Sequence, residues 1–338
     1  MQIIENHPLK NLNTFGIDVK ARYFTEMTSD EEITRLIASG FLTDKNYLIL
    51  NGGSNILFTR DFDGVVIKIG AKGIQLITEN ETMALVRASA GENWHNFVLW
   101  CIGQNFGGLE NLSLIPGNVG AAPIQNIGAY GVEQKDVFES LEAVEAETGR
   151  IRHFTRDECR FGYRNSVFKQ QLKNRYIILS VTYKLTKEHF FNTGYGDIQR
   201  ELSEMKDMPL TIKMISDAVC RIRNAKLPDP EKIGNAGSFF KNPTINASDF
   251  QSLQEKYPAI PGYPDGKEKY KIPAGWMIDH LGWKGFRHGD AGVCHTQALV
   301  LVNYGHAAGQ EILEIARAIM ESVKQNFGIV LEPEVNIY

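Results

Sequence analysis

Apolar residues at helical spacing predict the helices of this chain. Ser29-Asp-Glu-Glu32 is a capping box, apolar residues follow on one helical face up to residue 37, and Gly40 ends the segment. Prolines at 228 and 230 stop another periodic segment, so we expect a domain junction there. The same spacing predicts helices at residues 94–102, 211–225, 276–281 and 312–323, and a helix capped by Ser248.

Short apolar runs predict the strands. Some alternate between apolar and polar residues, as half-buried strands do, and others are apolar throughout. Strands and helices are mixed along the chain, which indicates an α+β fold, and the segments after the junction indicate a compact α/β domain. The predicted strands are 47–50, 56–58, 65–69, 83–89, 141–146, 151–154, 176–185 and 298–302.

Two glycine-rich stretches interrupt these elements. Asn51-Gly-Gly-Ser-Asn55 follows a strand directly, where consecutive backbone N–H groups can converge on an anion, although a tight turn has the same sequence. It matches neither the dinucleotide pattern G-x-G-x-x-G nor the P-loop. Residues 114–131 hold too many glycines and prolines for a regular element and too many apolar residues for a linker. We therefore predict one long ligand between the two backbones.

Composition narrows the function classes. The 338 residues exceed the usual single-domain core, so two or three domains are expected. A formal net charge of −4 argues against a general nucleic-acid binder. No signal peptide and no run of about 18 apolar residues occurs, so we expect a cytoplasmic, soluble protein without membrane insertion.

Cysteine and histidine spacing does not indicate a metal site. Cys101, Cys159, Cys220 and Cys294 lie far apart, and the eight histidines are scattered. We expect buried free thiols and no structural metal.

Two polar side chains lie among apolar neighbours. Arg164 within residues 161–168 suits a partly buried arginine that faces a carboxylate, or a structural ion pair. Ser238 lies in Gly234–Pro243, where Asn-Ala-Gly is typical of turns and the following Phe239 and Phe240 suit a core strand. On the local sequence alone, a purely structural turn is the favoured explanation of this second pattern.

The last residues carry paired carboxylates. Residues 331–337 alternate like a strand, which places Leu331, Val335 and Ile337 on one face and Glu332 and Glu334 on the other. Two neighbouring carboxylates can raise each other's pKa, and a protonated one can donate a hydrogen bond. A solvated acidic face is the ordinary alternative.

A series of motifs runs in order along nearly the whole chain. The motifs are Asn13–Ile17, Gly53–Asn55, Gly91–Trp94, Gly108–Leu112, Ile115–Gly117, Pro123–Gly131, Cys159–Arg164, Lys226–Pro230, Gly237–Pro243 and Leu331–Val335. Together they resemble the UDP-N-acetylenolpyruvoylglucosamine reductases of bacterial peptidoglycan synthesis. Any one motif could arise by chance, but the ordered set is specific. Tyr195 in Gly194–Asp197 is similar to the substrate-covering tyrosine loop of the family's longer type.

This resemblance implies a fold and its domains. We expect an FAD-binding fold of the vanillyl-alcohol-oxidase (PCMH) type in two lobes, followed by a C-terminal α/β substrate-binding domain. The first lobe would span residues 1–66 with a C-terminal strand at 329–338, the second lobe 67–222, and the substrate domain 223–328.

The resemblance also implies a reaction. NADPH would reduce non-covalently bound FAD, and hydride from the flavin N5 would convert UDP-N-acetylglucosamine enolpyruvate to UDP-N-acetylmuramate, in cell-wall synthesis that supports cell shape and division. Ser238 would donate the proton, while Arg164 and a protonated Glu334 would stabilise the enolate. No 2′-phosphate pocket is recognisable, so the choice of NADPH over NADH comes from the resemblance alone. We also expect a monomer.

Binding residues follow from the same resemblance. The expected FAD contacts are Asn51, Gly52, Gly53, Ser54, Asn55, Pro116, Gly117, Gly120, Gln125, Ile127 and Arg223. The expected substrate contacts are Tyr195, Lys226, Asn242, Gln297, Tyr263 and Lys284.

Three other functions explain part of the pattern. A related flavin oxidase or dehydrogenase of a small alcohol or hydroxy acid shares the flavin domain. It gives no reason for the joint set Tyr195, Lys226, Ser238, Asn242 and Glu334. A non-catalytic nucleotide-sugar binding protein needs the diphosphate donors but no flavin loop. A hydrolase with Ser238 as nucleophile lacks the G-x-S-x-G motif and an evident histidine base.

Overall fold

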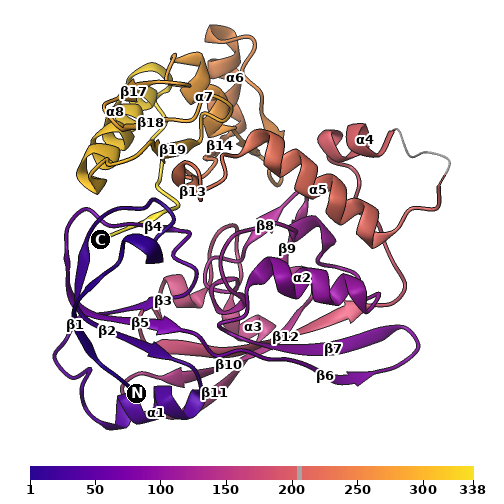
Figure 1. Ribbon diagram of the computed structural model, residues 1–338. Coiled ribbons are helices and arrows are strands. Elements are labelled where there is room, and N and C mark those ends of the chain that lie inside the picture. The colour runs from indigo at the N-terminus through magenta and orange to yellow at the C-terminus, as the bar shows by residue number, and fades with distance from the viewer. Residues whose placement is uncertain (204–207) are drawn as a thin grey trace. The chain divides into compact units, whose positions relative to one another are not determined.

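The computed structural model describes residues 1–203 and 208–338 (Figure 1). The chain divides into two compact units. The first comprises residues 1–7, 21–52 and 63–225, and the second comprises residues 8–20, 53–62 and 226–338. One boundary between the units, at residues 225 and 226, lies close to the junction expected from the prolines. The finer division into two flavin lobes and a substrate domain stays a prediction.

Two sheets build the first unit. One has the order β1 (Ile4–Pro8), β2 (Lys20–Met27), β5 (Phe62–Ile69) and β3 (Tyr47–Leu50), with β3 and β5 parallel. The larger, antiparallel sheet has the order β11 (Ile151–Thr155), β10 (Phe138–Glu145), β12 (Tyr176–Thr186), β7 (Met83–Ser89) and β6 (Ile74–Glu79). A two-stranded hairpin joins β8 (Gly128–Ala129) to β9 (Val132–Glu133).

Helices and 3₁₀ turns complete the first unit. The α-helices are α1 (Asp30–Ala38), α2 (Trp94–Gly103), α3 (Arg156–Cys159), α4 (Gly196–Leu202) and α5 (Ile212–Lys226). The 3₁₀ turns are η2 (Glu110–Leu112), η3 (Val119–Ala121), η4 (Gln134–Asp136) and η5 (Val167–Lys169). Trp94 and Phe97 of α2 are buried and pack against the buried Tyr183 of β12. The Trp94 ring meets the Tyr183 ring edge-on at a centroid distance of 5.9 Å, and the Phe97 ring is tilted against it at 5.4 Å. The helix therefore covers the larger sheet with the apolar face that its spacing predicted.

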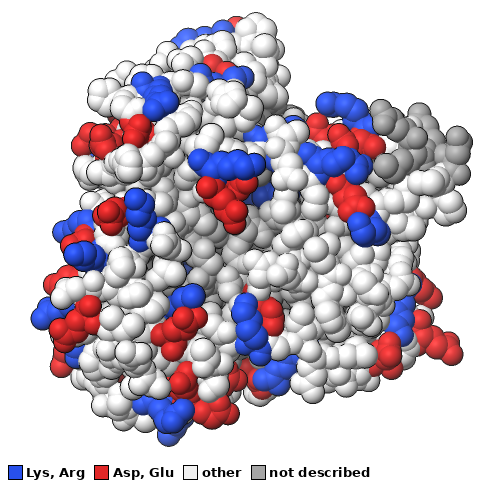
Figure 2. All heavy atoms as spheres, viewed as in Figure 1, with Lys and Arg blue, Asp and Glu red and all other residues white. Residues whose placement is uncertain are grey.

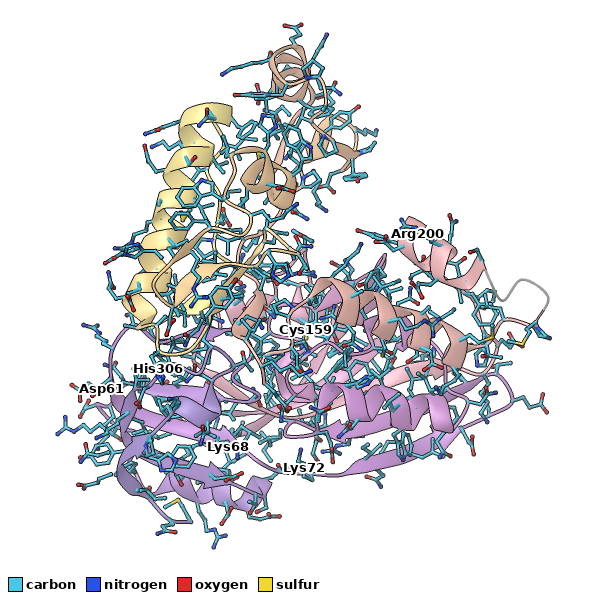
Figure 3. The ribbon with its side chains drawn as sticks, turned by 45° about the horizontal axis from the view of Figure 1, so that its top comes forward. Asp61, Lys68, Lys72, Cys159, Arg200 and His306 are labelled. Atoms are coloured by element: carbon cyan, nitrogen blue, oxygen red, sulfur yellow. The ribbon has the colours of Figure 1, made fainter. Side chains whose placement is uncertain are left out.

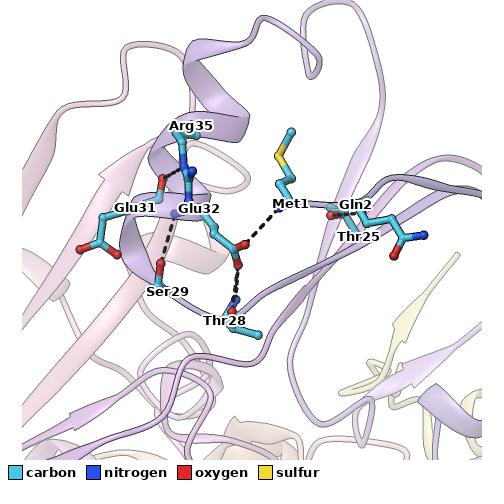
Figure 4. A network of polar contacts seen from close by, with 8 residues as sticks. All are labelled: Met1, Gln2, Thr25, Thr28, Ser29, Glu31, Glu32 and Arg35. Carbon is cyan, nitrogen blue, oxygen red and sulfur yellow. Dashed lines mark hydrogen bonds and ion pairs between the residues drawn. The ribbon is translucent and has the colours of Figure 1, made fainter.

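The predicted capping box of α1 forms with one change. The Ser29 hydroxyl accepts the backbone N–H of Glu32, as predicted (Figure 4). The Glu32 carboxylate does not return to Ser29; it accepts the backbone N–H and the hydroxyl of Thr28, each at 2.9 Å, and the amino group of Met1 at 3.2 Å. These hydrogen bonds, the backbone one first, lower the pKa of Glu32 to about 2.

Antiparallel pairing also builds the second unit. Its main sheet has the order β13 (Gly234–Ser238), β19 (Val300–Asn303), β18 (Ala291–Val293) and β17 (Arg287–His288). A smaller sheet has the order β14 (Thr244–Asn246), β16 (Lys269–Lys271) and β15 (Tyr263–Pro264), and β4 (Ile56–Leu57) pairs in parallel with β20 (Asn336–Ile337). The helices are η1 (Lys10–Leu12), α6 (Ala247–Lys256), α7 (Ala274–His280) and α8 (Gly309–Phe327).

Two predictions in the second unit were wrong in detail. Helix α6 begins at Ala247, so Ser248 lies inside its first turn and is not the cap. The pairing of β14 with β16 and the bond from the Ala247 N–H to the Glu268 carbonyl at 2.9 Å fix this earlier start. Ile337 is 38% exposed and does not share the burial of Leu331 and Val335, because the final segment is not one continuous strand.

Charged side chains of both signs lie on the visible surface, and the cysteines form no disulfide among the described residues. Figure 2 shows basic and acidic side chains next to one another over the visible face. All four cysteines are free; three are buried, including Cys159 inside the first unit (Figure 3), and Cys220 is half-buried. Within residues 1–203 and 208–338, no helix combines the length and apolar content that crossing a membrane requires. The same residues hold no cluster of His, Cys, Asp or Glu suited to a metal ion.

Candidate active site

The two glycine-rich stretches approach each other in the first unit. A Cβ placed on Gly52 would lie 2.6 Å from the Gly117 Cα and 2.9 Å from the Asn118 Oδ1. The second stretch is held to the start of α2, because the Trp94 N–H donates to the Gly117 carbonyl at 3.0 Å and the Asn118 amide donates to the Gly91 carbonyl at 2.7 Å. Only residues without a side chain permit this backbone contact.

The contact leaves both stretches accessible and one polar atom unpaired. Gly52 and Pro116 are exposed, whereas the Oδ1 atom of Asn51 is buried and has no hydrogen-bond partner among the described residues. A buried acceptor without a donor is costly, so a ligand with a polar group suits this position. Gly120 has another role, since its N–H already donates to the Ala90 carbonyl at 2.9 Å. It shapes the loop rather than offering a donor.

Two arginines of the first unit attach to the second glycine-rich stretch. Arg164 donates to the Gly128 carbonyl at 2.7 Å, and its guanidinium lies 5.3 Å from the Tyr163 ring centroid. Arg223 donates to the Leu114 carbonyl at 3.2 Å. Burial lowers the pKa of Arg223, and the positive charge of Arg164 acts in the same direction. Two cations against one loop favour an anionic ligand.

Tyr195 is linked to Arg223 through Tyr130 in the first unit. Its ring is 51% exposed and contacts the Tyr130 ring edge-on, at a centroid distance of 5.5 Å. Burial raises the pKa of Tyr130, and a hydrogen bond from Arg223 opposes this shift. Tyr195, Tyr130 and Arg223 therefore form one connected group.

Ser238 occupies the irregular end of β13 in the second unit. It pairs with Val300 after a register shift, and Gly237 before it has φ of 68°. The two phenylalanines that follow are 0% and 1% exposed, whereas Ser238 is exposed. The prediction that Phe239 and Phe240 are core residues is therefore confirmed. The Ser238 side chain itself is exposed.

Glu334 lies on the segment that pairs with the residues after Ser238. Its N–H donates to the Phe239 carbonyl at 2.8 Å, and its carbonyl accepts the Asn55 amide at 3.3 Å. The second unit thus brings Asn55, Ser238 and Glu334 onto connected backbone segments. Glu332 is separate, because its carboxylate forms an ion pair with Lys241 at 2.9 Å.

Two predicted diphosphate residues lie at the start of α7 in the second unit, and a third is bonded to the residue before one of them. The Asn242 Oδ1 accepts the Ala274 N–H at 2.9 Å, and the Gln297 Oε1 lies 3.3 Å from where a Cβ of Gly275 would be. The Thr296 hydroxyl donates to the Lys226 carbonyl at 2.9 Å, which places Lys226 beside Gln297.

The two other expected substrate residues are not brought into this group by a described contact. Tyr263 on β15 is 62% exposed. Lys284 forms an ion pair with Asp279 in the second half of α7.

His95 in the first unit was not predicted as a site residue. Its Nδ1 atom accepts the Leu114 N–H at 2.9 Å, so it supports the loop that Arg223 also holds. Burial lowers the pKa of His95, and the charge of Arg223 adds to this shift. Its position directly after the motif Gly91–Trp94 was the available signal.

Comparisons with known proteins identify two family matches along the chain. Residues 21–155 match the FAD binding domain family, and residues 229–338 match the family described as UDP-N-acetylenolpyruvoylglucosamine reductase, C-terminal domain. The proteins named UDP-N-acetylenolpyruvoylglucosamine reductase from Flavobacterium johnsoniae and Amoebophilus asiaticus are 51% and 52% identical, over 100% of this chain and 100% and 99% of theirs. The crystal structure of the Thermus caldophilus UDP-N-acetylenolpyruvylglucosamine reductase has a TM-score of 0.68 at 24% identity, covering 100% of this chain and 98% of that one.

Proposed function

We propose a function from the premise that this chain belongs to the UDP-N-acetylenolpyruvoylglucosamine reductase family, to which it is similar over its full length. The chain is an oxidoreductase, and its cofactor is FAD. We propose that NADPH is the hydride donor and that UDP-N-acetylglucosamine enolpyruvate is reduced to UDP-N-acetylmuramate for peptidoglycan synthesis. A cytoplasmic location and a monomeric state are parts of the same proposal.

The glycine-rich stretches fit the cofactor. The backbone of Asn51–Asn55 and of residues 116–127, with the cation of Arg223, would hold the FAD diphosphate and adjoining groups. The close approach of Gly52 to Gly117 and the unpaired Oδ1 of Asn51 support this assignment. When bound, FAD supplies the hydride that the enolpyruvyl double bond accepts.

Ser238 is proposed to deliver the proton. Hydride addition to one carbon of the enolpyruvyl group leaves negative charge on the other carbon and on its carboxylate, and that carbon must be protonated. An alcohol is a weak acid, but an enolate is basic enough to take its proton when the geometry is right. The exposed Ser238 hydroxyl suits this step, and the buried Phe239 and Phe240 hold the backbone that carries it.

Arg164 and Glu334 are proposed to stabilise the enolate. The bond from Arg164 to the Gly128 carbonyl fixes the plane of the guanidinium, whose N–H donors match a carboxylate. The backbone bond of Glu334 to Phe239 fixes the position from which its carboxyl group would act. A protonated Glu334 would donate a hydrogen bond to the developing charge.

Lys226, Asn242, Gln297 and Tyr195 are proposed to bind the substrate diphosphate. An ammonium, two amides and a phenol supply the donors that phosphate oxygens accept. The positions of Asn242 and Gln297 at the start of α7, and the bond from Thr296 to the Lys226 carbonyl, support this for the second unit. We retain Tyr263 and Lys284 as proposed substrate contacts with less structural support.

The exposure of Ser238 beside buried aromatic residues carries the proposal, and an anaerobic flavin titration tests it. NADPH should bleach the flavin absorbance, and UDP-N-acetylglucosamine enolpyruvate should restore it. In Ser238→Ala, bleaching should be retained while recovery slows by about 10²- to 10⁴-fold, the usual contribution of a general acid. Ser248→Ala, which removes another exposed hydroxyl from the same unit, should change neither step.

Each contrary result identifies what is wrong. Recovery at the wild-type rate in Ser238→Ala contradicts the proton-donor role. Bleaching without recovery in the wild-type protein contradicts the proposed substrate, and recovery only when air is admitted favours a flavin oxidase.

A further inference from the structure

The motif Gly108–Leu112 has no place in the mechanism above, yet it buries two polar side chains. Glu110 and Asn111 are 4% and 2% exposed. The Glu110 carboxylate accepts the Gly108 N–H at 2.6 Å, which closes the motif on itself. Buried polar side chains are kept where they form hydrogen bonds, so the partners of Asn111 indicate its role.

Asn111 joins two segments that lie far from it in sequence. Its amide donates to the carbonyl of Tyr130 at 3.2 Å and to the carbonyl of Asn192 at 2.9 Å. An asparagine amide has two N–H donors, so one side chain satisfies both carbonyls. The Asn192 side chain then donates to the Gly131 carbonyl at 3.1 Å. The three bonds tie residues 130–131 to residue 192.

Tyr130 and Gly131 form the tip of the β8–β9 hairpin. Their φ angles are 51° and 79°, as a two-residue hairpin turn of type I′ requires, and the flanking Ala129 and Val132 pair. A tyrosine at positive φ is unfavourable, so the surrounding bonds must hold it there. This backbone geometry directs the Tyr130 ring onto the edge-on contact with Tyr195.

The segment before Tyr195 is held at two further points. The Thr186 and Gly107 backbones pair with each other at 2.8 and 3.1 Å, and the His189 ring contacts the Asn105 carbonyl at 3.2 Å. The chain then reaches Asn192, Tyr195 and α4, which Arg200 marks in Figure 3. Residues 105–111 therefore run beside residues 186–192, and Asn111 is the last anchor before the tyrosine.

We propose that Asn111 is a positioning residue that sets the Tyr195 side chain for binding the nucleotide-sugar substrate. The Asn111 amide bonds two backbone carbonyls, so it acts through the Tyr130–Gly131 turn and the Asn192 carbonyl. This inference rests on the proposed function, which assigns Tyr195 to the substrate diphosphate.

The test compares Asn111→Leu with Tyr195→Ala in the FAD-loaded enzyme. Leucine has nearly the shape of asparagine but no donor. Losing each neutral hydrogen bond typically costs about 5-fold, so we expect KM for UDP-N-acetylglucosamine enolpyruvate to rise about 5- to 30-fold, with a smaller change in kcat. Amide hydrogen exchange of residues 190–198 should become at least about 10-fold faster. Asn111→Leu combined with Tyr195→Ala should bind substrate no worse than Tyr195→Ala alone.

Two further variants make the result interpretable. Ser113→Ala removes the bond between the Ser113 and Ser216 hydroxyls at 2.8 Å, another buried contact of the same stretch that does not reach residues 186–195. Ser113→Ala should leave KM for the substrate and amide hydrogen exchange at residues 190–198 unchanged. Asn192→Ala changes an exposed side chain and removes its bond to Gly131, so it should give a weaker form of the Asn111→Leu effect. It provides the test if Asn111→Leu folds poorly.

The outcomes separate the inference from the proposed function. Unchanged exchange at residues 190–198 in Asn111→Leu and Asn192→Ala overturns the positioning role, and so do additive effects on substrate affinity in the double variant. If Tyr195→Ala binds substrate normally, the diphosphate assignment fails, and the exchange measurement still decides whether Asn111 holds the segment.

Discussion

The contact between the two glycine-rich stretches gives a quantitative test of the cofactor cradle. In Gly52→Ala, the new methyl group would lie 2.6 Å from the Gly117 Cα, whereas carbon atoms pack best at about 3.5–4.0 Å. The nearest atom, the Gly117 Cα, belongs to the backbone and cannot rotate away, so one loop must move by about 1 Å, whereas the Asn118 Oδ1 at 2.9 Å belongs to a side chain. The φ angle of Gly52 is not positive, and the substitution therefore tests space rather than backbone strain.

The size of the effect follows from this overlap. Inserting a methyl group into a packed contact typically costs about 1–3 kcal/mol. If that cost falls on the loop arrangement that binds FAD, the affinity for FAD drops about 5- to 150-fold. Titrating apoprotein with FAD and following flavin fluorescence measures the affinity directly, and urea unfolding of the apoprotein measures any loss of fold stability.

Gly103→Ala is the matched control. Gly103 is the last residue of α2, and a Cβ there would meet nothing within 4 Å. Its FAD affinity should equal that of the wild type, with a stability gain of up to about 1 kcal/mol from helix propensity. Wild-type FAD affinity in Gly52→Ala would refute the cradle. A loss of apoprotein stability without a loss of affinity would mean that the loop contact is structural only.

The other predictions concern the diphosphate site and acid stability. Lys226→Met should raise the Kd for UDP-N-acetylglucosamine enolpyruvate, measured by equilibrium titration, by about 10-fold or more, the loss expected for a charged hydrogen bond; an unchanged Kd would reject the assignment. Because the folded pKa of Glu32, about 2, lies below its ordinary value near 4.5, its carboxylate stabilises the fold above pH 4.5 and loses this effect as the pH falls toward 2. Glu32→Gln should therefore lower Tm at pH 6 and have a smaller effect at pH 3; an equal change at both pH values would show that the ionised carboxylate contributes nothing.

Local patterns predicted most regular elements because the same residues that set the pattern also form the contacts. β7 spans Met83–Ser89 as predicted, and the apolar face of α8 is buried up to its end at Gly328, whose φ is 69°. Elements with weak local patterns were missed. The edge strand β6 leaves Leu76 and Ile77 exposed, and β1 has no fully buried residue. Their place in a sheet depends on pairing with other strands.

Residues whose hydrogen-bond partners lie far away in the sequence were the hardest to predict. The glycine-rich stretches could be identified because their composition is itself unusual, and Ser238 because a motif surrounds it. Asn111 also lies in a motif, Gly108–Leu112, but the motif does not reveal its role, since its hydrogen-bond partners are 19 and 81 residues away. His95 shows the same limit, because its partner Leu114 belongs to another loop.

The stretch around Ser238 shows why a structural and a functional interpretation of one motif need not compete. Phe239 and Phe240 are buried, and the Phe239 backbone bonds the Leu299 carbonyl at 2.7 Å and the Glu334 N–H at 2.8 Å. Those same bonds fix the backbone directly after Ser238 and at Glu334. A turn that had evolved only for packing would need the two rings but not an exposed hydroxyl at the register shift. Ser238→Ala should therefore leave the stability of the fold within about 0.5 kcal/mol of the wild type, as for surface substitutions, so that a slowed flavin recovery reports chemistry rather than unfolding.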